Sequence, residues 1–249
     1  MKVRKFKIKR NNLSICGKVY GDCSGVSPLV ILSHGFMANQ SMCKKYAKLL
    51  AEKGFIAVTF DFCGGGLFSS SGGKTYDMSV FTEVDDLEAV LDHFAEQSYV
   101  DKRKISLFGC SQGGFVSAIV AKRRSNMVNQ LIMFYPALCI PDDARRGNMV
   151  FAKFNPKNIP EKIRCGPMVI GKEYVESVIN EDVYSLIGDF SGRVLLIHGT
   201  KDNLVDISYS KKAIEKYSDI EFFEIEGAGH GFTAANDKRA KELLLEFIK

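Results

Sequence analysis

Two short segments near the N-terminus alternate between polar and apolar positions. They are residues 3–10 and 13–20, and Asn11-Asn12 stands between them. Alternation on both sides of a two-residue turn predicts an antiparallel hairpin. Six of the first ten residues are Lys or Arg, which is typical of an edge strand that is protected from pairing with another chain.

The rest of the chain carries short apolar runs without alternation, separated by segments with helical spacing. Apolar runs of this kind predict strands that are buried on both faces. They lie at 28–33, 55–60, 105–109, 131–135, 194–198 and 221–225, and the helical segments lie at roughly 40–53, 79–98, 113–123, 206–217 and 236–248. Alternation of strand and helix predicts an α/β fold with a mostly parallel twisted sheet flanked by helices.

Residues 136–186 interrupt this rhythm, because no clear strand can be identified in them. They contain five of the six prolines of the chain. A connection of this length is too long for a compact domain, so we interpret it as an inserted lid subdomain over the carboxyl ends of the strands. The alternative is a disordered loop, which the aromatic residues Phe151, Phe154, Tyr174 and Tyr184 disfavour. Residues 1–135 and 187–249 then form the core domain.

The strongest chemical signal is a G-x-S-x-G motif made by Gly109, Ser111 and Gly113. It follows a predicted buried strand and opens a predicted helix, which is the context of a nucleophile elbow. Glycine stands on both sides because side chains there would collide with the tight turn. Cys110 is expected to point into the sheet and to pack as a small apolar residue.

A serine hydroxyl needs a base and an orienting acid, and both candidates follow later strands. His230 lies in the glycine-rich stretch 227–232 after the last strand, and Asp202 follows the preceding strand. The order Ser111, Asp202, His230 is the order that this elbow requires. The alternative readings are a turn-capping aspartate and a surface histidine, and Asp206 is the second choice for the acid.

Two backbone amides are candidates for an oxyanion hole. The Gln112 amide lies at the start of the helix after the nucleophile, and the Phe36 amide lies in the loop after an early strand. Gly35 allows that loop to approach Ser111 closely. We expect His34 to shape this loop by hydrogen bonding, and we interpret His198 as structural.

The composition limits the classes of protein to which this chain can belong. The net charge of +5 is too small to indicate a nucleic-acid or membrane partner, and 46% hydrophobic residues without a long apolar run indicate a globular chain without a membrane span. Seven scattered cysteines and four histidines predict neither disulfides nor a metal site, and no cofactor is expected. The N-terminus lacks an apolar signal segment, so we expect a cytoplasmic protein. A homodimer stays open.

These motifs together resemble the α/β-hydrolase superfamily over nearly the whole chain. The matching parts are the hairpin, residues 34–36, 61–69, 109–113, 199–202 and Gly229-His230. Within the superfamily the chain is most similar to bacterial cinnamoyl (feruloyl) esterases, which carry a Ser-Gln-Gly-Gly elbow, here residues 111–114, and an inserted lid. The resemblance implies that esters of hydroxycinnamic acids are the substrates. By position, Asp143 and Tyr174 match the lid residues that bind the phenolic hydroxyls in that family.

The sequence therefore predicts a serine carboxylesterase that works through an acyl-enzyme on a small ester. Two departures from the esterase family are Cys110, where histidine is usual, and Val150, where some relatives have a polar residue. A general short-chain carboxylesterase remains an alternative. So does an acyl-peptide hydrolase or aminopeptidase, which would need acidic lid residues such as Glu173 or Glu176 to hold an amine. An inactive binding module is the remaining alternative.

Overall fold

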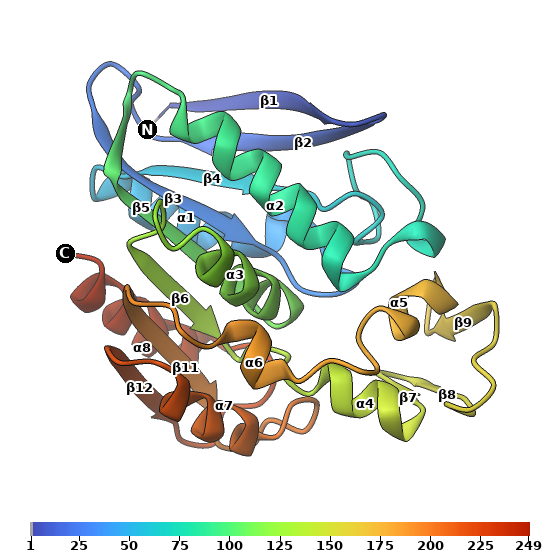
Figure 1. The fold of residues 1–249 in the computed structure, drawn as a ribbon. Coiled ribbons are helices and arrows are strands. Elements are labelled where there is room, and N and C mark those ends of the chain that lie inside the picture. The colour runs from blue at the N-terminus through green and yellow to red at the C-terminus, as the bar shows by residue number, and fades with distance from the viewer. Residues whose placement is uncertain (1) are drawn as a thin grey trace.

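The computed structural model describes residues 2–249, and its centre is an eight-stranded sheet (Figure 1). The strands are β1 (Val3–Arg10), β2 (Leu13–Tyr20), β3 (Ser27–Ser33), β4 (Ile56–Phe60), β5 (Val100–Cys110), β6 (Gln130–Phe134), β11 (Arg193–Gly199) and β12 (Ile220–Ile225). Their order across the sheet is β1-β2-β4-β3-β5-β6-β11-β12. In this sheet β2 pairs antiparallel with both β1 and β4, and the strands from β4 to β12 run parallel to one another. The predicted hairpin and mostly parallel sheet are confirmed.

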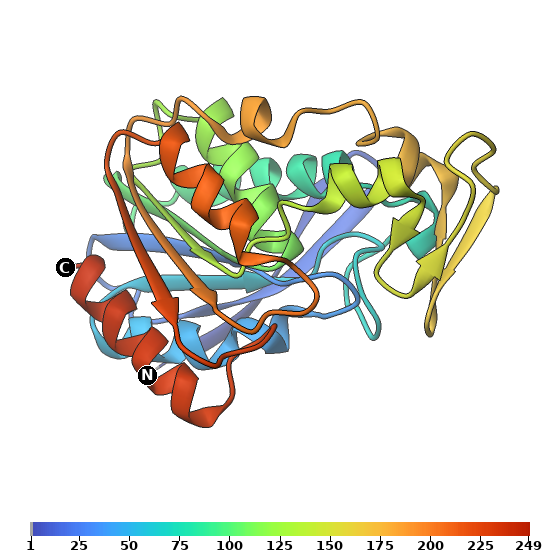
Figure 2. The same cartoon turned by 90° about the horizontal axis from the view of Figure 1, so that it is seen from below.

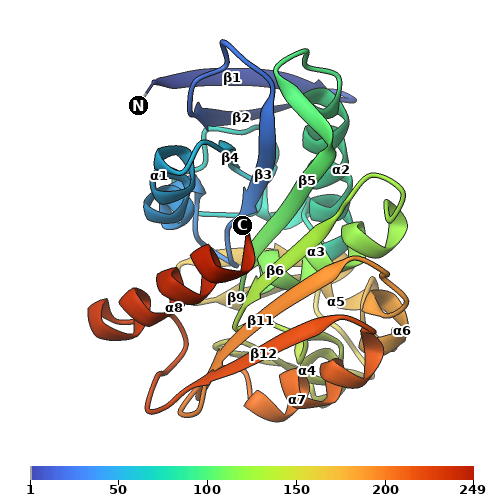
Figure 3. The same cartoon turned by 90° about the vertical axis from the view of Figure 1, so that its left-hand side faces the viewer.

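Helices cover both faces of the sheet (Figure 3). One face carries α1 (Lys44–Glu52) and α8 (Ala234–Phe247), and the other carries α2 (Val80–Ala95), α3 (Gln112–Arg123) and α7 (Ile207–Ala213). Short 3₁₀ helices are η1 (Gln40–Cys43), η2 (Thr75–Asp77) and η3 (Ile214–Lys216). Within β3, Leu29 and Ile31 join one core while Val30 and Leu32 join the other. Burial on both faces explains the apolar runs of the central strands β3, β4, β6 and β11. The run 221–225 was expected to be buried in the same way, but β12 lies at the edge of the sheet and is mostly half-buried.

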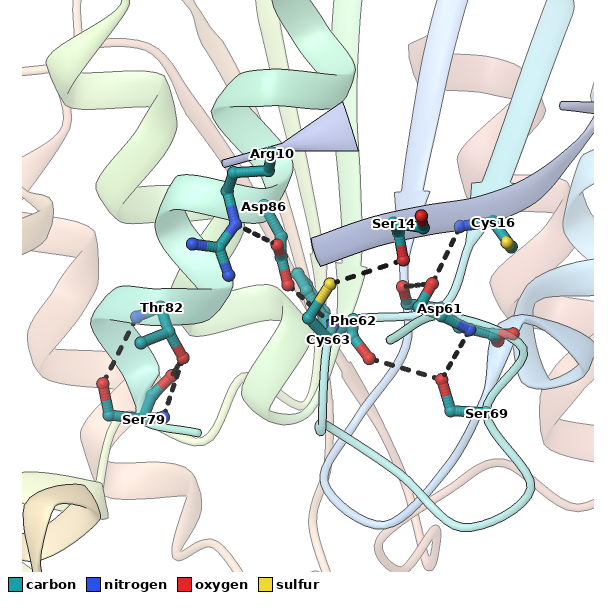
Figure 4. A network of polar contacts seen from close by, with 11 residues as sticks. Arg10, Ser14, Cys16, Asp61, Phe62, Cys63, Ser69, Ser79, Thr82 and Asp86 are labelled. Carbon is teal, nitrogen blue, oxygen red and sulfur yellow. Dashed lines mark hydrogen bonds and ion pairs between the residues drawn. The ribbon is translucent and has the colours of Figure 1, made fainter. Parts of the chain in front are cut away.

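A buried ion pair fastens the hairpin to the rest of the domain (Figure 4). The Arg10 guanidinium of β1 contacts one Asp86 carboxylate oxygen on α2, and the Cys63 amide donates to the other at 2.7 Å. The Cys63 thiol donates to the Ser14 carbonyl of β2 at 3.7 Å. The hairpin, the loop after β4 and α2 therefore share one polar cluster, in which each charge depends on its partner.

Residues 136–186 contain short helices and two small hairpins beside the end of the sheet where the parallel strands finish (Figure 2). The elements are α4 (Ile140–Arg146), β7 (Asn148–Met149), β8 (Ala152–Lys153), β9 (Lys162–Cys165), β10 (Met168–Gly171), α5 (Lys172–Glu176) and α6 (Val183–Ile187). The sequence indicates no strand here, and the structure corrects this. Strands of two to four residues are too short to produce a visible alternation.

Candidate active site

Ser111 occupies a strained turn between β5 and α3. Its backbone has φ 55° and ψ −124°, outside the regions that a side chain normally favours. A Cβ on Gly109 would lie 2.1 Å from the Gly113 carbonyl oxygen, and a Cβ on Gly113 would lie 2.3 Å from the His34 carbonyl oxygen. Both glycines of the motif are therefore required by close backbone contacts, and the turn presents the Ser111 hydroxyl at the edge of the sheet.

The loops after β11 and β12 bring Asp202 and His230 to this hydroxyl. His230 Nε2 lies 2.9 Å from Ser111 Oγ, and His230 Nδ1 lies 2.8 Å from Asp202 Oδ2. Asp206, the second choice for the acid, instead accepts a hydrogen bond from the Ser208 amide at 2.8 Å and caps α7. The three residues chosen from motifs and chain order are therefore connected by hydrogen bonds from Ser111 through His230 to Asp202.

The Asp202 carboxylate is buried, and both of its oxygens accept hydrogen bonds. Its Oδ1 accepts from the amides of Leu204 and Val205, both at 2.9 Å, and its Oδ2 contacts both His230 and His198. Burial raises the pKa of Asp202, but the hydrogen bonds from the two histidines outweigh it and hold that pKa well below its usual range. Asp202 is therefore a stable anion next to His230.

His34 orients the peptide group that carries the Phe36 amide. His34 Nε2 accepts from the Phe62 amide at 3.1 Å, so the proton sits on Nδ1 and is donated to the Gly35 carbonyl at 2.8 Å. The Gly35 carbonyl and the Phe36 N–H are opposite ends of one planar peptide group, so fixing one fixes the other. The expected loop-shaping role of His34 matches these contacts.

The Gln112 amide stands at the first position of α3, where a helix offers no acceptor for it. Both Phe36 and Gln112 line the same cavity as Ser111. A Cβ on Gly35 would come within 3.0 Å of Ser111 Cβ, which measures how closely the early loop approaches the nucleophile. The arrangement can thus present two backbone donors next to the Ser111 hydroxyl.

The Gln112 side chain belongs to a buried chain of hydrogen bonds that was not predicted from the sequence. The Gln112 side-chain amide donates to Glu83 Oε2 at 2.8 Å, and its Oε1 accepts from the Tyr174 hydroxyl at 2.5 Å. Reciprocal hydrogen bonds between Ser79 and Thr82 start α2 just before Glu83 (Figure 4). Burial raises the pKa of Glu83 well above its usual range, and no Lys or Arg of residues 2–249 forms an ion pair with it.

The cavity beside Ser111 has a volume of about 350 Å³ and is walled mainly by residues 136–186. Asp143 and Tyr174, the two expected substrate-binding residues, both line it. Burial raises the pKa of Asp143, although a hydrogen bond with Cys139 and the charge of Arg146 oppose this. Val150, Phe151 and Leu204 also line the cavity and are 47, 65 and 50% exposed, so its walls include exposed apolar side chains.

Within residues 2–249, no group of three or more His, Cys, Asp or Glu side chains is placed to hold a metal ion. In the same described part of the chain, no helix has the length and apolar character needed to cross a membrane.

Comparisons with known proteins place the chain among hydrolases. A family model described as serine aminopeptidase, S33, matches residues 25–176. YcjY of Escherichia coli (strain K12) is 33% identical over 99 residues, which are 38% of this chain and 31% of that protein. The putative esterase YitV of Bacillus subtilis (strain 168) is 32% identical over 96 residues, which are 36% of this chain and 37% of that protein. The chain thus matches about a third of the length of these relatives.

A solved structure matches far more of the chain. Est1E from Butyrivibrio proteoclasticus with bound ferulic acid has a TM-score of 0.89 and 25% sequence identity, and the match covers 98% of this chain and 99% of that one. The structural likeness therefore extends over nearly the full length, whereas the sequence matches are confined to parts of it.

Proposed function

Because the chain belongs to the serine aminopeptidase S33 family of α/β hydrolases, we propose that it is a serine carboxylesterase acting on hydroxycinnamate-type esters. The observation that carries the proposal is the hydrogen-bonded row from Ser111 through His230 to Asp202, which opens into a largely apolar cavity with a carboxyl group in its wall. The match to a structure that holds ferulic acid supports the acyl group.

The reaction follows from the positions of the atoms. Ser111 Oγ attacks the ester carbonyl as His230 Nε2 takes up its proton, and Asp202 stabilises the imidazolium. The amides of Phe36 and Gln112 bind the developing oxyanion. His230 then gives its proton to the leaving alcohol, and a water molecule hydrolyses the acyl-enzyme with the same histidine as base.

The cavity suits a planar aromatic acyl group. A volume of about 350 Å³ lies within the range of small-ligand sites, where apolar walls bind the bulk of a ligand and a few polar groups orient it. Phe36 and Tyr174 face each other there, with ring centroids 5.7 Å apart. The Asp143 carboxyl in the same wall is the proposed acceptor for a ring hydroxyl.

Aminopeptidase activity is the second candidate, because the matching family description names it. It would need a carboxylate to hold a free ammonium group. Glu173 and Glu176, which we considered for this role, are absent from the described residues that line the cavity, and Asp143 is the single carboxyl group among them. Burial raises the pKa of Asp143, which makes it a weaker partner for a cation. These observations favour the esterase.

Hydrolysis rates on four substrates test the proposal: methyl ferulate, methyl caffeate, a short-chain nitrophenyl ester and an aminoacyl anilide. We expect both methyl hydroxycinnamates to be hydrolysed with higher kcat/KM than the anilide. Ser111→Ala should abolish fluorophosphonate labelling and catalytic turnover by the nucleophile, while thermal unfolding stays unchanged. The remaining rate should exceed that of the reaction in water by at most about 10³-fold. Faster hydrolysis of the anilide would reject the esterase, and an active Ser111→Ala variant would reject the nucleophile.

A further inference from the structure

His198 is a second histidine on the carboxylate of Asp202. It lies on β11, four residues before Asp202, and is fully buried. Its Nε2 is 3.1 Å from Asp202 Oδ2 and 3.1 Å from the Val205 carbonyl oxygen, and its Nδ1 is 2.7 Å from Ser210 Oγ on α7. The histidine therefore connects the Asp202 carboxylate to α7 through Ser210.

The partners of the ring determine where its proton lies. Two oxygen acceptors face Nε2, and neither a carboxylate nor a carbonyl can donate, so Nε2 must carry a hydrogen. The Ser210 hydroxyl can donate to Nδ1, which completes a neutral imidazole without leaving a buried group unpaired. Asp202 Oδ2 then receives N–H groups from two imidazole rings, His198 on one side and His230 on the other.

We propose that His198 is a positioning residue that shares the Asp202 carboxylate with His230 and thereby sets how strongly Asp202 favours the protonated form of the base. The inference rests on the proposed function, since it concerns the same Ser111, Asp202 and His230. When His198 donates to Asp202 Oδ2, part of the negative charge on that oxygen is already stabilised by the His198 N–H group. Less remains to stabilise the His230 imidazolium, so the base stays neutral and active to lower pH.

The surroundings of Asp202 allow this effect to be measured. The titratable groups that face it are His230 from the loop after β12, Cys139 before α4 and Asp206 at the start of α7. In residues 2–249, its ion-pair partners are the two histidines alone, with no Lys or Arg. Among the contacts that lower the pKa of Asp202, the hydrogen bond from His198 has the largest effect. Because no Lys or Arg side chain in this described part of the chain pairs with Asp202, no cation would mask the loss of this hydrogen bond.

Two amide substitutions of His198 separate its contacts. In His198→Gln the side-chain amide reaches the position of Nε2 and keeps a donor for Asp202. In His198→Asn the shorter amide reaches only the position of Nδ1 and loses that donor. Both variants place a neutral amide in the same buried site, so they differ mainly in which partner they keep. His93→Gln, on a half-buried helix residue remote from the cavity, is the control for a histidine replacement.

The readout is the pH profile of kcat/KM on the nitrophenyl ester, per active site as counted by fluorophosphonate labelling. For His198→Asn we expect the acidic limb to move to higher pH by about 0.5 to 1 unit and kcat to fall about tenfold, with KM changed less than about twofold. His198→Gln should restore the wild-type limb and most of kcat, and His93→Gln should match the wild type throughout.

An acidic limb that stays in place in His198→Asn, or that moves to lower pH, overturns the inference, and so does an equal shift in both amide variants. If His198→Asn does not fold, His198→Leu gives the second test, because a leucine of similar volume removes the Nε2 donor to Asp202. An acidic limb that stays in place in His198→Leu also overturns the inference. Activity retained in Ser111→Ala would instead reject the proposed function, so the two failures are distinguishable.

Discussion

Glu83 is a buried carboxyl group whose contacts predict a specific dependence of stability on pH. It lies in the first turn of α2, is 1% exposed, and accepts a hydrogen bond from the Gln112 side chain at 2.8 Å. Burial raises its pKa well above the ordinary value, and the nearby Asp86 raises it further against the hydrogen bond from Gln112. Folding therefore favours the protonated form of Glu83.

The sign of the effect follows from proton binding. Above the unfolded pKa of about 4.3, the unfolded chain releases this proton while the folded chain keeps it. The folded state then binds more protons, so the free energy of unfolding falls as the pH rises through this window, by up to about 1.4 kcal/mol per unit. The fall ends where the pH passes the folded pKa of Glu83. Glu83→Gln removes this titration and keeps an oxygen acceptor for Gln112.

Denaturant unfolding of the wild type and of Glu83→Gln at pH 5, 6, 7 and 8 measures the difference. We expect the two proteins to be similar at pH 5 and the variant to become increasingly more stable as the pH rises, by about 1 to 3 kcal/mol at pH 7. Glu88→Gln makes the same change at a partly exposed position of α2 and should show no such trend. A stability difference that does not change between pH 5 and pH 8 would refute a neutral Glu83.

Two further predictions concern the loop beside Ser111 and the wall of the cavity. Gly35→Ala places a Cβ 3.0 Å from Ser111 Cβ and 3.5 Å from Ser111 Oγ. We therefore expect kcat to fall by up to about 100-fold while the melting temperature stays unchanged. A wild-type kcat in this variant would contradict the close approach of Gly35 to Ser111. Asp143→Ala should lower kcat/KM on methyl ferulate more than on methyl cinnamate, which lacks a ring hydroxyl, and Tyr174→Phe should do the same more weakly. Equal losses on both esters would remove these residues from ring recognition.

The core of the fold can be predicted from the sequence because its strands are buried on both faces. The apolar run 28–33 became β3, whose alternate side chains pack into two different cores. The hairpins of residues 136–186 could not be predicted in this way. With two to four residues a strand, their pairing depends on packing against the rest of the segment rather than on a local pattern.

Chain order and turn chemistry were sufficient to choose Ser111, Asp202 and His230, because each follows a strand that ends at the same edge of the sheet. Glu83 escaped notice, since a glutamate in a helix usually faces water. A signal was present: it occupies the same helix face as the buried Val80, Val84 and Leu87, where a charged side chain needs an explanation. His198 likewise stands four residues before Asp202, but only the fold shows that His198 and His230 contact the same Asp202 oxygen.

The contacts of Asp143 and Tyr174 decide how large the preference for a ring hydroxyl should be. A buried hydrogen bond that loses its partner costs roughly 5- to 150-fold, and the upper end applies when the remaining group has no other contact. Asp143 keeps the Arg146 guanidinium at 3.5 Å, and its side chain is 26% exposed, so water and Arg146 can serve it when the substrate lacks a hydroxyl. Tyr174 likewise has Gln112 as a permanent acceptor. We therefore expect methyl ferulate to exceed methyl cinnamate by a factor near the lower end, about 5- to 20-fold in kcat/KM, and a ratio above about 100 would show that Asp143 loses both alternatives in the complex.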